Sequence, residues 1–277
     1  MGYVRQMLAG LGRLLAIAAA GLLVALLAIP PLALVLRVEP GDMLRRITQP
    51  LVLDALRLSL VTSIASTFIV IVLGLPTAFF VARGRSRAMR LVETLVDLPM
   101  VLPPTVAGAG LLLAFGRSGL VGHQLQAMGI TLPFTTLAVV LAQTFVAAPF
   151  FVSALVAGLR EVEPRYLEVA ATLRTSPGAT LFRVMLPLSM PSLLAGAGMA
   201  WARALGEFGA TVTFAGNLPG VTQTLPLAVY AALQSDVQAA VALSVLLLAV
   251  SIVILLGLRL LPAVLVSGRR DAARDVR

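Results

Sequence analysis

The chain has 277 residues, of which 59% are hydrophobic and 12% are charged, and its mean hydropathy is +1.01. A soluble domain carries about a quarter charged residues, so this composition indicates one integral membrane domain filling residues 1–277. The 21 basic residues are all arginine, with one histidine and no cysteine, which excludes disulfides, a metal site rich in thiolates or histidines, and a phosphate loop that needs lysine. If ATP is used, another polypeptide binds it. The arginines are scattered without interleaved aromatics, which argues against nucleic acid as a partner.

Six apolar runs reach the roughly 20 residues that a helical span requires. They cover residues 14–36, 56–82, 91–115, 135–159, 184–205 and 239–258. The first run follows Arg5 and Arg13, but it is about twice as long as the core of a signal peptide, so we interpret it as a span. The predicted fold class is therefore an all-α membrane protein with six transmembrane helices.

Arginine is unevenly divided between the two sides that these spans define. Fifteen arginines lie on the side of the amino terminus, five lie on the opposite side, and Arg203 lies within the fifth span. The positive-inside rule therefore places both termini and the polar segment 160–183 in the cytoplasm. The segment 206–236 contains no arginine and is expected to face outward.

Prolines interrupt the third predicted span. Pro99, Pro103 and Pro104 remove backbone donors at membrane depth, which is tolerated where the backbone is buried in protein or lines a water-filled cavity. We therefore assign this span, including Thr105 beside the proline pair, to a translocation path in preference to a merely kinked packing helix.

Few charged residues lie within the predicted spans. Asp97 follows Glu93 by four residues and lies near the arginine-rich stretch 83–90, so we interpret Asp97 as a member of an ion pair at the cytoplasmic end rather than as a proton relay. Arg203 and Glu207 stand one helical turn apart near the outer end of the fifth span. They are interpreted either as a self-neutralising pair or as a weak attraction for a passing anion, tempered by the carboxylate.

Between the fourth and fifth spans, two short helices are predicted over residues 167–173 and 179–184, around a Thr-Ser-Pro-Gly turn. This segment combines an acidic residue, two small residues and a helix break. These residues are Glu168, Ala170, Ala171, Ser176, Pro177 and Gly178. From the residues alone, a docking element for a cytoplasmic partner and an amphipathic linker lying on the bilayer explain the segment equally well.

The segment 166–193 resembles the coupling motif of ABC importer permeases, which reads E-A-A, three residues, G, nine residues, I-x-L-P. The residues at the motif positions are Glu168, Val169 for the first Ala, Ala170, Arg174 for the Gly, Val184 for the Ile, Leu186 and Pro187. The departure at Arg174 requires either a right-handed backbone or strain, because left-handed backbone favours glycine. With the resemblance, docking becomes the preferred interpretation.

Two further stretches, 98–122 and 202–230, are similar to the molybdate permease subunits of bacterial ABC importers and more loosely to the sulfate permeases. Within the second stretch, residues 222–227 resemble the molybdate or tungstate permeases in particular, rather than the oxyanion permeases as a whole. The resemblance implies a homodimer in the cytoplasmic membrane of a bacterium or archaeon. It also implies two cytoplasmic ATPase chains that bind ATP with Mg²⁺ and dock on the 160–183 segment, and an external binding protein that delivers the substrate. This chain would then catalyse no reaction and hold no cofactor.

Neutral donors are concentrated in the predicted outer segment. They are Thr211, Thr213, Asn217, Thr222, Gln223 and Thr224. Such groups can hydrogen-bond a tetrahedral oxyanion without trapping it, but ordinary turn chemistry explains them equally well. The alternatives for the whole chain are a sulfate or thiosulfate permease and, more remotely, an ion-coupled secondary transporter, for which we find neither an inverted repeat nor a carboxylate relay.

Overall fold

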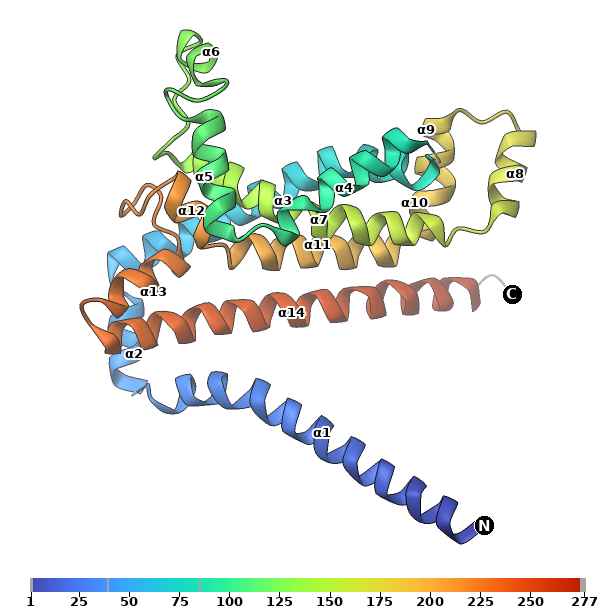
Figure 1. Ribbon diagram of the computed structural model, residues 1–277, viewed down its shortest axis with the longest axis horizontal. Helices are drawn as coiled ribbons and strands as arrows, with labels where there is room; N and C mark the ends of the chain where they lie inside the picture. Colours follow the sequence, from blue (N-terminus) through green and yellow to red (C-terminus); the bar gives the residue numbers. More distant parts are fainter. Residues whose placement is uncertain (1, 39, 85, 275–277) are drawn as a thin grey trace.

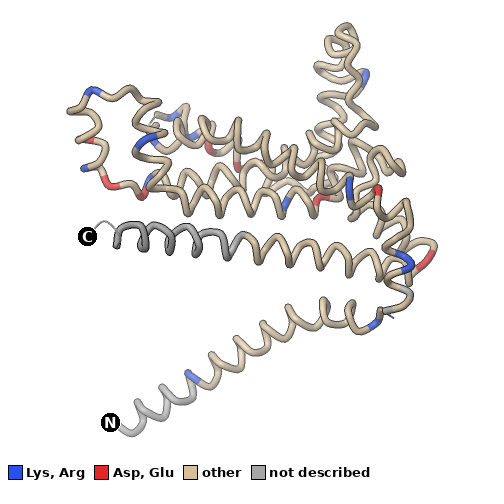
Figure 2. Tube along the Cα trace, turned by 180° about the vertical axis from the view of Figure 1, so that it is seen from behind, with Lys and Arg blue, Asp and Glu red and all other residues tan. Residues whose placement is uncertain are grey.

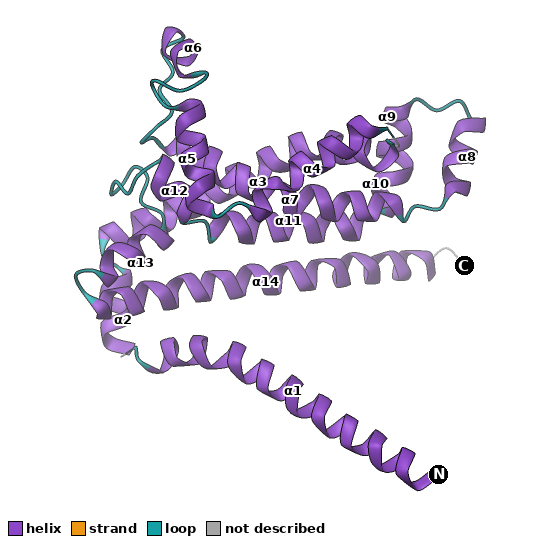
Figure 3. Ribbon diagram, in the orientation of Figure 1, coloured by secondary structure: helices purple, strands orange, loops and turns teal. Residues whose placement is uncertain are grey.

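The computed structural model of the chain describes residues 2–38, 40–84 and 86–274, and within these ranges every regular element is a helix (Figure 3). The long helices are α1 (Gly2–Leu36), α3 (Pro50–Arg83), α7 (Thr136–Arg160) and α14 (Val237–Arg274). The helices of intermediate length are α4 (Arg87–Val101), α5 (Pro104–Phe115) and α11 (Met190–Leu205). The short elements are α2 (Pro40–Ile47), α6 (Gly122–Ala127), α8 (Pro164–Thr172), α9 (Pro177–Thr180), the π-helix η1 (Leu181–Met185), α10 (Leu186–Leu188), α12 (Gly209–Phe214) and α13 (Leu225–Leu233).

Four helices in the described part of the chain are long and apolar enough to cross a membrane individually. They occupy Gly12–Leu36, Pro50–Arg83, Thr136–Arg160 and Val237–Gly257, and they cover the first, second, fourth and sixth predicted spans. Two bent helix pairs bring the number to six if each pair counts as one span. The all-α class with four to six spans is therefore confirmed.

The third predicted span, residues 91–115, does not form one continuous helix. It divides into α4 and α5, whose directions differ by 118°. Leu102 has extended backbone because a residue that precedes proline is kept out of the helical region, and Pro104 starts α5 at the first helical position, where its missing N–H costs nothing. The proline pair therefore redirects the chain, so that α5 lies beside α12 while α6 projects away from the other helices (Figure 1).

The fifth predicted span, residues 184–205, also needs correction. The segment Pro177–Leu188 and the helix α11 meet at an angle of 82°, and Ser189 between them has φ −94° and ψ 13°. The first residues of the predicted span therefore belong to the polar segment that the sequence placed at 160–183. Only α11 remains as the straight part of this span.

The centre of the molecule is the packing of α3, α7 and α11, where glycines let neighbouring helices approach closely. A Cβ placed on Gly74 of α3 would lie 2.7 Å from the Phe151 ring of α7, and one on Gly196 of α11 would lie 3.1 Å from the Phe151 carbonyl oxygen. By contrast, none of residues 12–36 of α1 is buried. The three central helices are therefore the rigid frame on which the other elements are placed.

The molecule has two distinct ends along this frame. One end carries α8 and α9, and α1 begins and α14 ends toward that side, whereas α2 and α13 lie at the opposite end (Figure 1). Many charged residues lie near helix ends and in the connections, and the described stretches 14–36 of α1 and 237–257 of α14 are uncharged (Figure 2). We call these two sides the α8 end and the α13 end.

Candidate functional site

The helix-turn-helix predicted between the fourth and fifth spans is present as α8 and α9. Ser176 precedes α9 as its N-cap, and its hydroxyl accepts a hydrogen bond from the Ala179 N–H at 3.2 Å. Pro177 follows at the first helical position, the place where proline is favoured. Gly178 has open space around it, so the start of α9 is specified by the serine cap and the proline and does not require the glycine.

The end of α8 is a Schellman motif with arginine in the position that usually holds glycine. Arg174 has φ +52°, its N–H donates to the Ala171 carbonyl at 3.0 Å, and the Thr175 N–H donates to the Ala170 carbonyl at 3.1 Å. The backbone therefore keeps the left-handed conformation that suits the glycine of the motif. Of the two possibilities raised by the sequence, strain at Arg174 is the one that the structure shows, at a cost of roughly 1 kcal/mol.

One face of α8 is apolar and uncovered. Tyr166, Val169 and Leu173 are 40%, 58% and 71% exposed, and their i, i+3, i+7 spacing puts them on one stripe. Glu168 and Ala171 are exposed as well, whereas Ala170 is buried. The three stripe residues were not among the predicted coupling residues, although their helical spacing would have revealed them.

The α8–α9 element is tied firmly to the central helices. Leu181 and Met185 of η1 are buried in the main hydrophobic cluster with residues of α7 and α11. The Ser189 hydroxyl, beyond Pro187 and α10, donates to the Gly158 carbonyl of α7 at 3.0 Å. The chain that follows α9 is therefore packed against α7 and α11.

Toward the α13 end, two breaks in the helices meet. A Cβ on Gly209, where α12 begins, would lie 2.7 Å from the Pro104 side chain at the start of α5, and one on Gly108 would lie 2.7 Å from the Ala210 carbonyl oxygen. Pro103, Pro104 and Thr105 themselves are exposed. Interrupted backbone that lies at membrane depth and is not covered by its own chain must line a cavity or contact another protein.

The predicted pair of Arg203 and Glu207 lies at this meeting of breaks. The Arg203 Nη1 is 2.7 Å from the Glu207 Oε2, and the two side chains are 27% and 1% exposed. The other carboxylate oxygen, Oε1, accepts a hydrogen bond from the Ala210 N–H at 2.8 Å. The ion pair that the sequence predicted therefore forms, with the carboxylate held in the break between α11 and α12.

Asp97 has a different partner from the one that the sequence predicted. Its Oδ1 accepts a hydrogen bond from the Ser153 hydroxyl of α7 at 2.7 Å, and the described residues include no ion pair of Asp97. Glu93 makes the ion pair instead, with two contacts of 2.9 and 3.0 Å to Arg160. The two acidic residues together hold α4 against α7.

The predicted neutral donors differ in whether the protein itself uses them: the Thr213 and Thr222 hydroxyls make hydrogen bonds, whereas the Thr211 and Thr224 hydroxyls are buried without a partner among the described residues. Thr211 belongs to α12 and is fully buried, which corrects its assignment to an outer loop. The Thr222 hydroxyl accepts the Leu218 N–H at 2.9 Å, so it serves the turn. Gln223 and Thr224 are also buried. The turn-chemistry alternative therefore describes Thr222 in this conformation.

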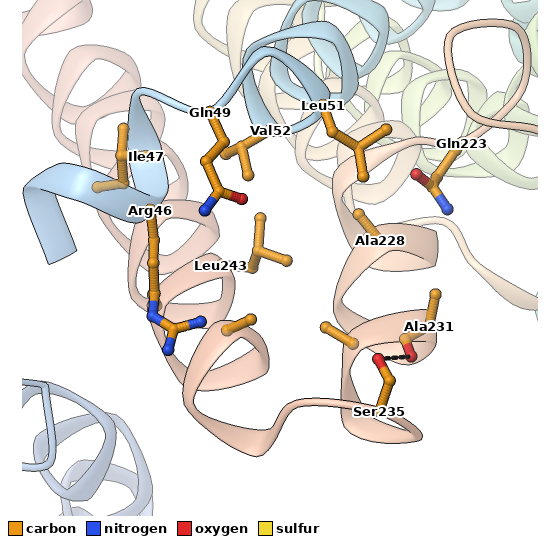
Figure 4. A pocket seen from close by; sticks show the side chains of 13 residues that line it. Arg46, Ile47, Gln49, Leu51, Val52, Gln223, Ala228, Ala231, Ser235 and Leu243 are labelled. Carbon is orange, nitrogen blue, oxygen red and sulfur yellow. Dashed lines mark hydrogen bonds between the residues drawn. The ribbon is translucent and has the colours of Figure 1, made fainter. Parts of the chain in front are cut away.

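Gln223 lines a cavity of about 230 Å³ between α2, α3, α13 and α14 (Figure 4). The walls are mainly alanine and aliphatic side chains, and the polar residues in the lining are Arg46, Gln49, Gln223 and Ser235. Arg46 contacts the Asp236 carboxylate at 2.7 Å. This contact, with the Ala239 N–H, holds the pKa of Asp236 below its usual range. The cavity is therefore mostly apolar, and the positive charge of Arg46 in its wall is neutralised by Asp236.

These features define a multi-pass α-helical membrane protein with two interrupted spans and an exposed helical element at one end. The family model described as "Binding-protein-dependent transport system inner membrane component" matches residues 71–264, and the chain belongs to this family. The chain is 48% identical over 230 residues to the "Molybdenum transport system permease protein ModB" of Mycobacterium tuberculosis, covering 83% of this chain and 87% of that protein. It is 36% identical over 183 residues to the ModB protein of Escherichia coli K12, covering 66% and 80%.

Solved structures show the same fold at lower sequence identity. A bacterial ABC transporter involved in the import of alginate superposes with a TM-score of 0.71 at 15% identity, covering 90% of this chain and 94% of that one. The inward-facing MetNI methionine ABC transporter superposes with a TM-score of 0.62 at 21% identity, covering 77% and 96%. These likenesses concern the fold alone.

Proposed function

We propose that this chain is the membrane-spanning subunit of an ATP-driven importer that takes molybdate, and also tungstate, from an external binding protein. The observation that carries the proposal is the 48% identity to relatives named for molybdenum transport, over 83% of the chain. The family description itself names a binding-protein-dependent transport system. ATP with Mg²⁺ would be bound by a separate cytoplasmic ATPase chain, since the present chain has no lysine for a phosphate loop.

The exposed stripe of Tyr166, Val169 and Leu173 supports docking of that ATPase on α8. An apolar helix face at a polar end of a membrane protein fits a partner surface better than water. The capped turn gives this face a fixed shape, and the burial of η1 links it to α11. ATPase closure would therefore move α8 and α9 as one body and change the packing around Arg203 and the α5–α12 contact.

A homodimer is the assembly that best accounts for the surfaces left open. Residues 12–36 of α1 contain no buried residue, and the interrupted backbone at Pro103 and Pro104 is exposed. A second copy placed against the break would enclose it and turn it into the wall of a path. Each copy contributes one α8, so the dimer presents two docking elements to two ATPase chains.

Orientation is proposed from the arginine distribution, with both termini and α8 in the cytoplasm. Reporter domains fused after Arg174 and after Gly220 test it directly. We expect a cytoplasmic signal from the first fusion and an external signal from the second. The reversed pair of signals would overturn the topology and, with it, ATPase docking on α8.

The substrate is tested with the complete complex in proteoliposomes, including its own binding protein and ATPase. Uptake and ATP hydrolysis are compared for molybdate, tungstate and sulfate, with and without the binding protein. We expect molybdate and tungstate to stimulate both activities only when the binding protein is present. Stimulation by sulfate alone would move the chain to the sulfate branch of the family.

A further inference from the structure

The pairing of Arg203 and Glu207 is incomplete in a way that points to a ligand. Nη1 of Arg203 lies 2.7 Å from Oε2 of Glu207, yet within the described part of the chain this oxygen accepts no hydrogen bond of suitable geometry. Among the described residues, Arg203 forms its ion pair with Glu207. A guanidinium offers five N–H donors in a rigid fork, so Glu207 neutralises Arg203 while leaving its donors available.

The two side chains differ in how firmly they are held. Glu207 is 1% exposed, and its Oε1 accepts the Ala210 N–H at 2.8 Å, so the carboxylate is fixed in the helix break. Arg203 is 27% exposed and shares the α11 surface with the exposed residues Ala202 and Gly206. Part of the Arg203 side chain is therefore accessible, at a surface where its exposed neighbours have small side chains or none.

The chemistry of the Arg203 guanidinium suits a tetrahedral oxyanion. Arginine binds such anions through two parallel N–H···O contacts, which a point charge such as lysine cannot make. An unopposed arginine in a medium of low dielectric would hold a dianion strongly. Because Glu207 cancels the net charge, the attraction is weak enough for the anion to leave, as passage through a conduit requires.

We propose that Arg203 contacts the transported oxyanion through the edge of its guanidinium that faces away from Glu207. Glu207 is a positioning residue that fixes the arginine and shortens the lifetime of the contact. This inference rests on the proposed function, because it assumes that the solute is an oxyanion. It assigns the contact to one side chain, whereas the neutral donors of the segment 206–236 are mostly buried or occupied.

The rival explanation is a purely structural ion pair that neutralises an arginine inside the membrane. The two explanations differ in what they predict for isosteric variants. A structural pair weakened by Glu207→Gln lowers the amount of folded protein and changes anion retention and transport together. If Arg203 instead contacts the anion and Glu207 weakens that contact, Glu207→Gln makes anion retention and transport change in opposite directions.

The experiment uses the complete complex with its binding protein, prepared as wild type, Glu207→Gln, Arg203→Lys and Arg203→Gln/Glu207→Gln. Two quantities are measured per folded complex: the molybdate uptake rate, and the half-time for loss of bound molybdenum in the presence of a non-hydrolysable ATP analogue. Arg57→Lys is the matched control, because Arg57 is an exposed arginine on α3 outside the proposed contact.

For Glu207→Gln we expect the half-time of retention to rise at least fivefold while uptake falls at least fivefold. For Arg203→Lys and for the double variant we expect both quantities to fall at least fivefold, with Arg57→Lys like wild type. The double variant leaves no unpaired buried charge, so it reports on the contact even where a single variant folds poorly. Wild-type uptake and retention in the double variant would overturn the inference, as would parallel changes in Glu207→Gln. A wild-type complex that imports no oxyanion would instead overturn the proposed function.

Discussion

The turn between α8 and α9 and the contact between α5 and α12 are both places where helices stop, but they are built from different interactions. At the turn, the Thr175 N–H bonds the Ala170 carbonyl and the hydroxyls of Thr175 and Thr180 lie 2.8 Å apart. At the second site, Gly108 and Gly209 admit backbone from a helix far away in the sequence. An element that is held by local hydrogen bonds can tolerate substitutions on its exposed face. An element that depends on close packing with a distant helix cannot tolerate added side-chain volume at the contact.

Glycine substitutions give the sharpest contrast between the two regions. A side chain at Gly108 meets the Ala210 carbonyl oxygen, which belongs to the backbone and cannot rotate away, whereas Gly178 has open space. We expect Gly108→Val to cost about 3 kcal/mol or more, a large share of total stability, and Gly178→Ala to be neutral or mildly stabilising. The amount of monodisperse protein in detergent and its unfolding temperature measure both. Equal tolerance at the two positions would show that the α5–α12 contact is loose.

Bulk on the exposed face of α8 should separate folding from coupling. We expect Ala171→Trp to fold normally but to lower transport at least tenfold, equivalent to about 1.4 kcal/mol in the docking equilibrium. Glu168→Ala, which removes one polar contact, should lower transport two- to threefold, corresponding to about 0.5 kcal/mol. Ala127→Trp on α6 is the control, because Ala127 is also exposed but lies outside the docking element. Transport unchanged by both α8 variants would reduce this element to a linker.

Arg174 tests whether the left-handed turn stores strain. Replacing it with glycine relieves roughly 1 kcal/mol or more of backbone strain but adds freedom to the unfolded chain, so we expect a net gain of about 0.5–1 kcal/mol. The same change at Arg165, inside α8, should destabilise by about 1 kcal/mol. Hydrogen exchange of the 164–180 segment provides the measurement. Loss of stability in Arg174→Gly would mean that the arginine side chain itself contributes there.

The smallest effect is expected at the α13 end, for Asp236→Asn. This change removes an ion pair with Arg46 whose side chains are 26% and 47% exposed, and ion pairs in contact with solvent contribute little to stability. Because Arg46 lowers the pKa of Asp236, the pair stabilises above the ordinary aspartate pKa and is lost as pH falls through the lowered value. Thermal unfolding should therefore differ little between wild type and variant, and equally at pH 6 and pH 8. A large or pH-dependent difference in that range would point to a further role for this pair.

Several features of the protein follow from the sequence alone. Apolar runs and sparse charge determined the membrane class and the positions of the straight helices, because a span is set by local hydrophobicity. The helix break at Ser176 and Pro177 was readable because capping involves neighbours within one turn, although the predicted helix began at Ala179 and α9 begins at Pro177. The i, i+4 spacing likewise determined the pairing of Arg203 with Glu207.

Only the tertiary structure decided how the broken helices are used. The prolines predicted a helix break near Pro103. The 118° angle between α4 and α5 depends on what α5 packs against, and the local sequence does not specify those contacts. The sequence likewise left open that Asp97 bonds Ser153 and that Thr211 is buried. The physical reason is range: propensities and caps act over one helical turn, whereas burial, bends and partner choice are settled by contacts between residues far apart in the chain.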